Sequence, residues 1–248
     1  MLSERHYSPE IAEFARRIGL SLRVRQHLGQ STSRRRGRMV RLPYRPGDDD
    51  VDIDETIAAY LQHQPFSNRD VVVRRRRHAP MAAVVMVDLS GSMEGDKWKT
   101  AASTIIGLSL WMRDQLDAFG VVAFWSDAAV LCPIDAPVSA ATVVDRMLRI
   151  PARGLTNVHF ALTVGAAELA RANAERRVGI LLSDCVHNAG PDPRAVARQF
   201  PSLSVLLQTS GEVDPMLAQG LARQTRGMVA PIATHRDVGP ALARVLNL

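Results

Sequence analysis

The sequence is poor in cysteine and contains no long apolar run. Its two cysteines, Cys132 and Cys185, are the only thiols in 248 residues, and they lack the spacing of a metal site. So few thiols exclude a disulfide framework and are typical of a reducing compartment. No apolar run approaches the roughly 18 residues of a membrane span, and the first residues form no apolar signal segment. We therefore expect a cytoplasmic protein without a membrane span.

Lysine is also scarce, so the positive charge is carried almost entirely by arginine. Residues 1–80 contain sixteen arginines and ten acidic residues, whereas residues 81–248 contain fifteen basic and fifteen acidic residues. The formal excess of +6 therefore lies in the N-terminal third. The run from Arg34 to Arg38 could bind phosphate backbones. No aromatic residues alternate with these arginines, however, so a solvated linker or a protein-docking segment is the other interpretation.

Short apolar runs alternate with helical patterns from Met81 onward. Strands are expected at about 83–88, 120–125, 128–132, 177–183, 203–208 and 227–232, and helices at about 97–117, 139–148, 157–172, 214–224 and 237–246, with a short one ending near 199. This alternation predicts an α/β fold of the Rossmann-like, doubly wound type, with a mostly parallel six-stranded sheet and helices on both faces. A hairpin around Ser126 and Asp127 would make one edge strand antiparallel.

Two regions are expected: residues 1–80 as a basic N-terminal extension with short helices and a linker, and residues 81–248 as the main domain. Within the extension, the sequence predicts a helix from Ser8 to about Leu28, a linker over 34–47, a helix over 55–62 capped by Asp52 or Asp54, and a strand at Val71–Val73.

The apolar run Val84–Val87 leads directly into Asp88, Ser90 and Ser92. Such a run, followed by a polar turn and a helix, predicts a buried strand whose carboxyl end carries a ligand site. One carboxylate and two hydroxyls are hard oxygen donors, which suit Mg2+, Mn2+ or Ca2+ rather than zinc or copper. The alternative is a helix-capping turn in which Asp88 or Ser90 is the N-cap.

Two distant segments offer further oxygen ligands. Thr156 precedes a helical pattern, and a second apolar strand ends at Asp184. The order Asp-x-Ser-x-Ser, then Thr, then Asp resembles the metal-ion-dependent adhesion site of von Willebrand factor A (VWA) domains, over roughly residues 80–235. The resemblance implies that a divalent cation, Mg2+ or else Mn2+ or Ca2+, is held by the matching residues, which are Asp88, Ser90, Ser92, Thr156 and Asp184. It further implies that an open coordination position captures an Asp or Glu of a partner protein. No general base is evident beside a substrate pocket, so an enzyme is not expected.

A looser resemblance concerns the N-terminal third. Acidic residues, the segment from Asp52 to Thr56 and the Val- and Arg-rich segment before the metal strand look like bacterial intracellular VWA proteins. These include CoxE-like proteins and the D-type subunits of magnesium chelatases. The resemblance implies a MoxR-type AAA+ ATPase as partner, in metal insertion or in the maturation or remodelling of a client protein.

Two other functions stay open from the residues alone. The Arg-rich third could bind nucleic acid, and a metal-dependent hydrolase could use the same fold. Cys185 and His187 could in principle form a nucleophile and its base, but no third group to orient the histidine is evident.

Overall fold

The computed structural model describes residues 38–44, 51–62, 71–77, 81–90, 96–115, 118–136, 139–150 and 154–246. These residues fall into two compact units, one within Gln30–Ala79 and the other within Pro80–Leu248. The helix expected from Ser8 to about Leu28 lies outside the described residues.

The smaller unit contains a two-stranded antiparallel sheet and one helix. Its elements are β1 (Arg38–Pro43), α2 (Ile53–Gln62) and β2 (Val72–Arg77). Strand β1 corrects the prediction of a linker over 34–47, which was wrong for the six residues that pair with β2. Arginine, glycine and proline indicated a loop locally, but pairing with a distant valine-rich strand determines the conformation. The helix confirms the prediction for 55–62, and the carboxylate of Asp52 accepts a hydrogen bond from the Glu55 amide at 3.4 Å.

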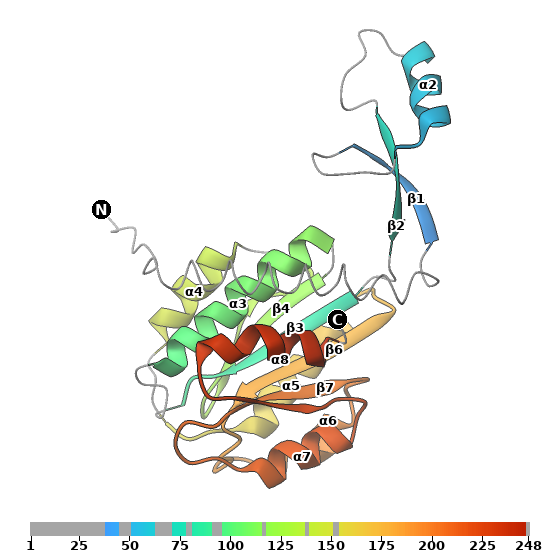
Figure 1. The fold of residues 1–248 in the computed structure, drawn as a ribbon. Coiled ribbons are helices and arrows are strands. Elements are labelled where there is room, and N and C mark those ends of the chain that lie inside the picture. The colour runs from blue at the N-terminus through green and yellow to red at the C-terminus, as the bar shows by residue number, and fades with distance from the viewer. Residues whose placement is uncertain are drawn as a thin grey trace, which may run out of the picture. The chain divides into compact units, whose positions relative to one another are not determined.

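The larger unit is built on a six-stranded sheet (Figure 1). Its elements are β3 (Met81–Asp88), α3 (Asp96–Gln115), β4 (Ala118–Phe124), β5 (Ala128–Cys132), α4 (Ala140–Arg149), α5 (Val158–Ala170), β6 (Arg176–Ser183), α6 (Arg194–Ala197), β7 (Leu203–Gln208), α7 (Pro215–Arg223), β8 (Val229–Ile232), the short 3-10 helix η1 (His235–Asp237) and α8 (Val238–Val245). The strand order is β5-β4-β3-β6-β7-β8. All neighbours are parallel except β4 and β5, which form the predicted antiparallel edge. The predicted fold class is confirmed.

The sheet separates two apolar cores. Strand β3 is buried along its whole length, and its residues alternate between the two faces. Val85 and Val87 pack in the core that α3, α4 and α8 cover, whereas Val84 and Met86 pack in the core that α5, α6 and α7 cover. A strand buried on both faces accounts for the continuous apolar run in the sequence.

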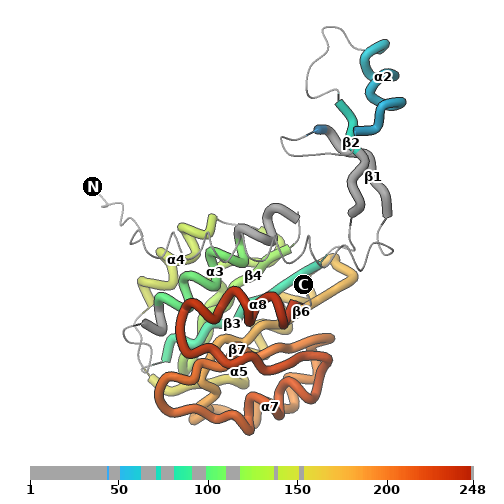
Figure 2. Tube along the Cα trace, viewed as in Figure 1, coloured from blue at the N-terminus to red at the C-terminus, as the bar shows by residue number. Residues whose placement is uncertain are grey.

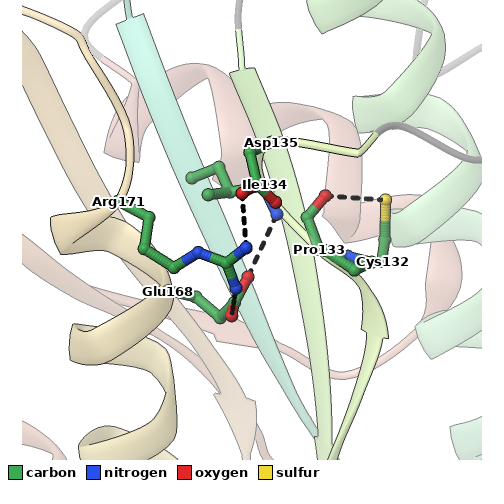
Figure 3. A network of polar contacts seen from close by, with 6 residues as sticks. All are labelled: Cys132, Pro133, Ile134, Asp135, Glu168 and Arg171. Atoms are coloured by element: carbon green, nitrogen blue, oxygen red, sulfur yellow. Dashed lines mark hydrogen bonds and ion pairs between the residues drawn. The ribbon is translucent and has the colours of Figure 1, made fainter.

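A polar network fastens α5 to the segment that follows β5 (Figure 3). The carboxylate of Glu168, a residue only 6% exposed, accepts a hydrogen bond from the Ile134 amide at 3.0 Å. Its other oxygen accepts one from Arg171 at 2.8 Å, and the same guanidinium also pairs with Asp135. The network therefore fixes the C-terminal part of the helix whose first turn follows Thr156.

Replacing Glu168 with alanine is expected to lower the free energy of unfolding by about 1–3 kcal/mol, because the buried Ile134 amide loses its acceptor. Urea denaturation measures this change. Asp135→Ala is the matched control, since it removes only the half-exposed ion pair with Arg171 and should change stability much less. Equal midpoints for Glu168→Ala and the wild type would show that the amide finds another acceptor.

Candidate metal centre

Strands β3 and β6 lie side by side in the sheet and end at the same edge (Figure 2). The register pairs Val87 with Leu182. The last residues of the two strands, Asp88 and Ser183, therefore lie next to each other, and Asp184 follows at once. Parallel pairing thus brings together residues that are far apart in the sequence.

The carboxylate of Asp88 is held from two sides. It accepts a hydrogen bond from the Ser183 hydroxyl at 2.6 Å and another from the Ser90 amide at 2.9 Å. The residue is only 2% exposed. Burial raises the pKa of the Asp88 carboxyl, although bonds from Ser183 and Ser90 act in the opposite direction, and the negative charge of Asp184 raises it further. The site thus holds a desolvated carboxylate next to a second acidic residue.

The loop after β6 places Asp184 in a tight turn. The Asp184 carboxylate accepts a hydrogen bond from the Val186 amide at 3.1 Å, and its carbonyl accepts one from the Asp214 amide at 3.0 Å. Cys185 follows with a φ of 63°, and its amide donates to the Ser183 hydroxyl at 2.9 Å. Left-handed backbone is uncommon for a residue other than glycine. Because the Ser183 hydroxyl accepts from the Cys185 amide and also donates to the Asp88 carboxylate, it connects this turn to Asp88.

Thr156 is fixed by hydrogen bonds to the same loop. Its amide donates to the Asn188 side chain at 2.7 Å, and its carbonyl accepts from the Asn188 amide at 3.2 Å. The next residue, Asn157, caps α5 by accepting from the Phe160 amide at 3.0 Å. Its own amide donates to the carbonyl of Trp125 at 2.9 Å. Three segments thus determine where Thr156 lies.

Gly190 leaves room for the side chain of Asn157, the residue that follows Thr156 and caps α5. Its φ is 84°, and a Cβ atom there would lie 2.6 Å from the side-chain oxygen of Asn157. A larger residue would displace the capping asparagine beside Thr156.

Cys185 and His187 do not form a nucleophile and base. Cys185 is buried, and burial together with the charges of nearby carboxylates raises the pKa of its thiol. Both ring nitrogens of His187 have other partners: Nδ1 accepts from the Val158 amide at 3.3 Å, and Nε2 lies 3.0 Å from the Pro191 carbonyl. The histidine therefore fixes the start of α5.

The structure brings four of the five predicted site residues to one edge of the sheet. Asp88, Ser90, Thr156 and Asp184 are each no more than 5% exposed. Ser92 lies outside the described residues. Hydrogen bonds join Asp88 to Ser90 directly, and the loop that contains Asp184 contacts Thr156.

Sequence reasoning missed three residues that position the site, namely Ser183, Asn188 and Asp214. Ser183 could have been suspected, because it directly precedes Asp184 at the end of a strand. Asn188 gave no local signal, since its partner Thr156 is 32 residues away. Asp214 is recognisable as the N-cap of α7, where its carboxylate accepts from the Leu217 amide at 2.8 Å, but not as a neighbour of Asp184.

The donor set fits a hard divalent cation. Among the described residues, no group of three or more His, Cys, Asp and Glu could hold a metal ion. The available donors are therefore two carboxylates, Asp88 and Asp184, and the hydroxyls of Ser90 and Thr156. Such oxygens suit Mg2+, Mn2+ or Ca2+. None of the ion pairs between described side chains involves Asp88, so a cation would offset the cost of burying its charge.

Residues 83–186 match the family model of the von Willebrand factor type A domain. This part of the chain is a VWA domain. The matched range begins in β3 and ends just after Asp184, so it contains the edge of the sheet described above.

Solved structures share the fold of the VWA domain at low sequence identity. An aerotolerance-related membrane protein from Bacteroides fragilis has a TM-score of 0.57 and 15% identity, with 67% of this chain and 98% of that chain covered. The conserved hypothetical protein BatB from Bacteroides thetaiotaomicron has a TM-score of 0.51 and 16% identity, with 68% and 100% covered. A von Willebrand factor type A protein from Catenulispora acidiphila has a TM-score of 0.54 and 20% identity, with 68% and 42% covered. At these identities the likeness establishes the fold alone.

No curated protein matches the chain. Among the described residues, no helix combines the length and the apolar character needed to cross a membrane.

Proposed function

We propose that the VWA domain is a metal-dependent protein-interaction module that binds Mg2+, or else Mn2+ or Ca2+, and through it an acidic residue of a partner protein. The observation that carries this proposal is the buried Asp88 carboxylate, which lies beside Asp184 and beside hydroxyl donors and makes no ion pair with a described side chain. The VWA fold is often used for protein–protein interaction, which supports the same function.

The residues of the chain have separate tasks in this mechanism. Asp88 and Asp184 would supply negative charge to the cation, and the hydroxyls of Ser90 and Thr156 would supply neutral oxygens. Ser183 orients the Asp88 carboxylate by donating to it at 2.6 Å. Ser92 is included as a ligand on the resemblance alone. A bound divalent cation supplies positive charge that attracts a carboxylate, and few charged ligands from the chain leave much of that charge available.

Exposed apolar side chains near the site support a protein as the partner. Leu155, directly before Thr156, is 51% exposed, and Met216, in the first turn of α7 after Asp214, is 71% exposed. Large exposed apolar side chains next to a polar site are typical of protein-binding surfaces. A partner carboxylate flanked by apolar residues would match this surface.

The identity of the partner is proposed from the resemblance of the N-terminal third to CoxE-like and chelatase D-type proteins. We propose a MoxR-type AAA+ ATPase and a client protein, with a role in metal insertion or in client maturation or remodelling. Both cysteines are free and buried, which is compatible with the cytoplasm as the location.

Capture of partners from the native host tests this function. The full chain is immobilised and washed with lysate in Mg2+ or in EDTA. The proposal expects a protein that is retained in Mg2+ and released by EDTA. Retention that is identical in both conditions would contradict it.

Replacing Ser183 with alanine is expected to weaken Mn2+ binding by about 10–100-fold, as is typical when a group that orients a metal ligand is lost. The reason is that the Asp88 carboxylate loses its bond from the Ser183 hydroxyl. Calorimetric titration with Mn2+ measures the affinity. Ser204→Ala is a control, since Ser204 is an equally buried serine on β7. An unchanged affinity in Ser183→Ala would show that Ser183 does not position a metal ligand.

A further inference from the structure

The sheet of the smaller unit concentrates charge of one sign. Two of the six residues in β1 and four of the six in β2 are arginine, and neither strand contains an acidic residue. We call this pair of strands the arginine ribbon. The VWA domain, by contrast, lies in the part of the chain whose charges cancel. The ribbon therefore contains six arginine positions and no acidic position within two paired strands.

The register opposes like charges across the ribbon. Arg38 is paired with Arg77, and Arg41 with Arg74. Residues directly opposite each other in an antiparallel pair are close neighbours, and like charges at such positions are destabilising. An anionic partner lying across the ribbon would remove this repulsion. The arrangement is thus unfavourable for the free protein and favourable for a complex with a polyanion.

Contacts with α2 hold β2 in place. The hydroxyl of Thr56 accepts a hydrogen bond from the Val72 amide at 3.0 Å, and the Val72 carbonyl accepts one from the Asp52 amide at 2.8 Å. Val73 is only 1% exposed. These bonds attach the first residue of β2 to α2 and to the residue that precedes this helix. The strand pairing gives the arginine positions a regular spacing.

We infer that the arginine ribbon is a binding surface for the phosphate backbone of nucleic acid. Successive residues of a strand are about 3.3 Å apart, and successive phosphates of a nucleic-acid strand are about 3.4 Å apart along the helix axis. Successive residues alternate between the two faces, so arginine positions on one face of β2 are about 6.6 Å apart, close to twice the axial spacing of the phosphates. With the opposed residues of β1, one face carries the positions of Arg75, Arg77 and Arg38, and the other carries those of Arg74, Arg76 and Arg41. Each face can therefore contact about every second phosphate of one strand. Guanidinium groups also bind phosphate oxygens in a bidentate manner. Binding through phosphates alone is independent of base sequence.

A regular row of one sign favours a nucleic acid over an acidic protein. Nucleic acid carries a negative charge at every repeat, whereas protein surfaces usually mix charges of both signs. The binding surface proposed for the VWA domain differs in kind, since it depends on a metal and on a single carboxylate. The two surfaces can therefore be tested separately.

The test compares two variants that each remove two arginines, both in EDTA so that the metal site does not contribute. Arg41→Gln with Arg74→Gln removes one opposed pair of the ribbon. Arg223→Gln with Arg226→Gln removes two exposed arginines from the VWA domain and serves as the charge-matched control. Fluorescence anisotropy with a labelled DNA duplex of mixed sequence gives the dissociation constant between about 50 and 200 mM salt.

The ribbon variant should bind the duplex more weakly than wild type at low salt. The slope of log affinity against log salt should decrease in magnitude by about 1.8, that is, by about 0.9 for each of two lost phosphate contacts. The control should keep nearly the wild-type slope. The ribbon variant should unfold at the wild-type temperature or slightly above it, because a like-charge pair has been removed, so weaker binding will not reflect misfolding.

Two results would overturn the inference. One is a slope in the ribbon variant equal to that of the wild type or of the control. The other is displacement of the duplex by polyglutamate at least as readily as by unlabelled duplex, which would assign the ribbon to an acidic protein.

Discussion

The variant Asp88→Asn is expected to bind Mg2+ and Mn2+ at least about a hundredfold more weakly than the wild type. Asp88 accepts from the Ser90 amide with one oxygen and from the Ser183 hydroxyl with the other. Asparagine keeps one oxygen for the Ser90 amide, and its NH2 group can donate to the Ser183 hydroxyl, but it removes a negative charge that would stabilise the cation. Loss of groups that only orient a metal ligand already costs about 10–100-fold in affinity, so loss of a ligand charge should cost at least as much. Calorimetric titration with each ion measures the change.

The same variant should make the metal-free protein at least as stable as the wild type. Burial raises the pKa of Asp88 above the ordinary value of 3.8, so the folded metal-free protein binds a proton more tightly there than the unfolded chain does. The contribution of Asp88 to stability is therefore greatest below pH 3.8 and is lost as the pH rises through the folded pKa. Asparagine lacks this loss, so the advantage of Asp88→Asn in EDTA should grow with pH across that window.

Thermal unfolding in EDTA checks the stability, and Asp145→Asn is the control, because Asp145 is a half-exposed carboxylate on α4. If Asp88→Asn binds Mn2+ as well as Asp145→Asn does, Asp88 is not a metal ligand. If the unfolding temperature of Asp88→Asn in EDTA is instead well below that of the wild type, the Asp88 charge stabilises the metal-free fold. The argument that burial of this charge is destabilising would then be wrong.

The elements of the VWA domain could be predicted because local patterns and tertiary packing agree. Val84–Val87 is apolar at every position because both faces of β3 are covered, and the turn residues Ser126 and Asp127 separate two short apolar runs. In β1 local composition and pairing disagree. Arginine and proline favour a loop there, whereas the pairing of Leu42 with Val73, 31 residues along the chain, produces a strand. A short stretch of sequence around β1 does not include β2, so the local pattern cannot reveal that the two strands pair.

The candidate site likewise combines residues that local sequence patterns indicate with residues that only distant pairing brings into place. Asp88, Thr156 and Asp184 could be selected from the sequence because each lies where a strand ends or a helix begins. The residues that fix their geometry could not be selected, because their partners are far away in sequence. Ser183 bonds to Asp88 across two strands, and Asn188 bonds to Thr156 across a loop and a helix. Their roles depend on strand register, which the periodicity of a single segment does not reveal.

The second large effect concerns the complex with the partner protein. Both EDTA and the substitution Asp184→Asn should abolish the stable complex at every salt concentration. The reason is that the partner carboxylate would bind through the metal, and Asp184 supplies one of the two carboxylates that the described residues place in the site. Asparagine keeps an oxygen that can accept from the Val186 amide, so the loop should retain its turn. Binding kinetics with the co-purified partner measure the loss as a rapid dissociation.

Asp192→Asn is the matched control for this experiment. Asp192 is an exposed carboxylate a few residues further along the chain, and its oxygens accept hydrogen bonds from the backbone and side chain of Arg194. The control should keep the slow dissociation of the wild type in Mg2+. A complex that survives both EDTA and Asp184→Asn would show that a metal is at most structural in this domain. A complex that is lost on neutralising Arg41 and Arg74 but survives EDTA would instead place the protein partner on the arginine ribbon, because salt-dependent attraction between exposed charges requires no metal ligand.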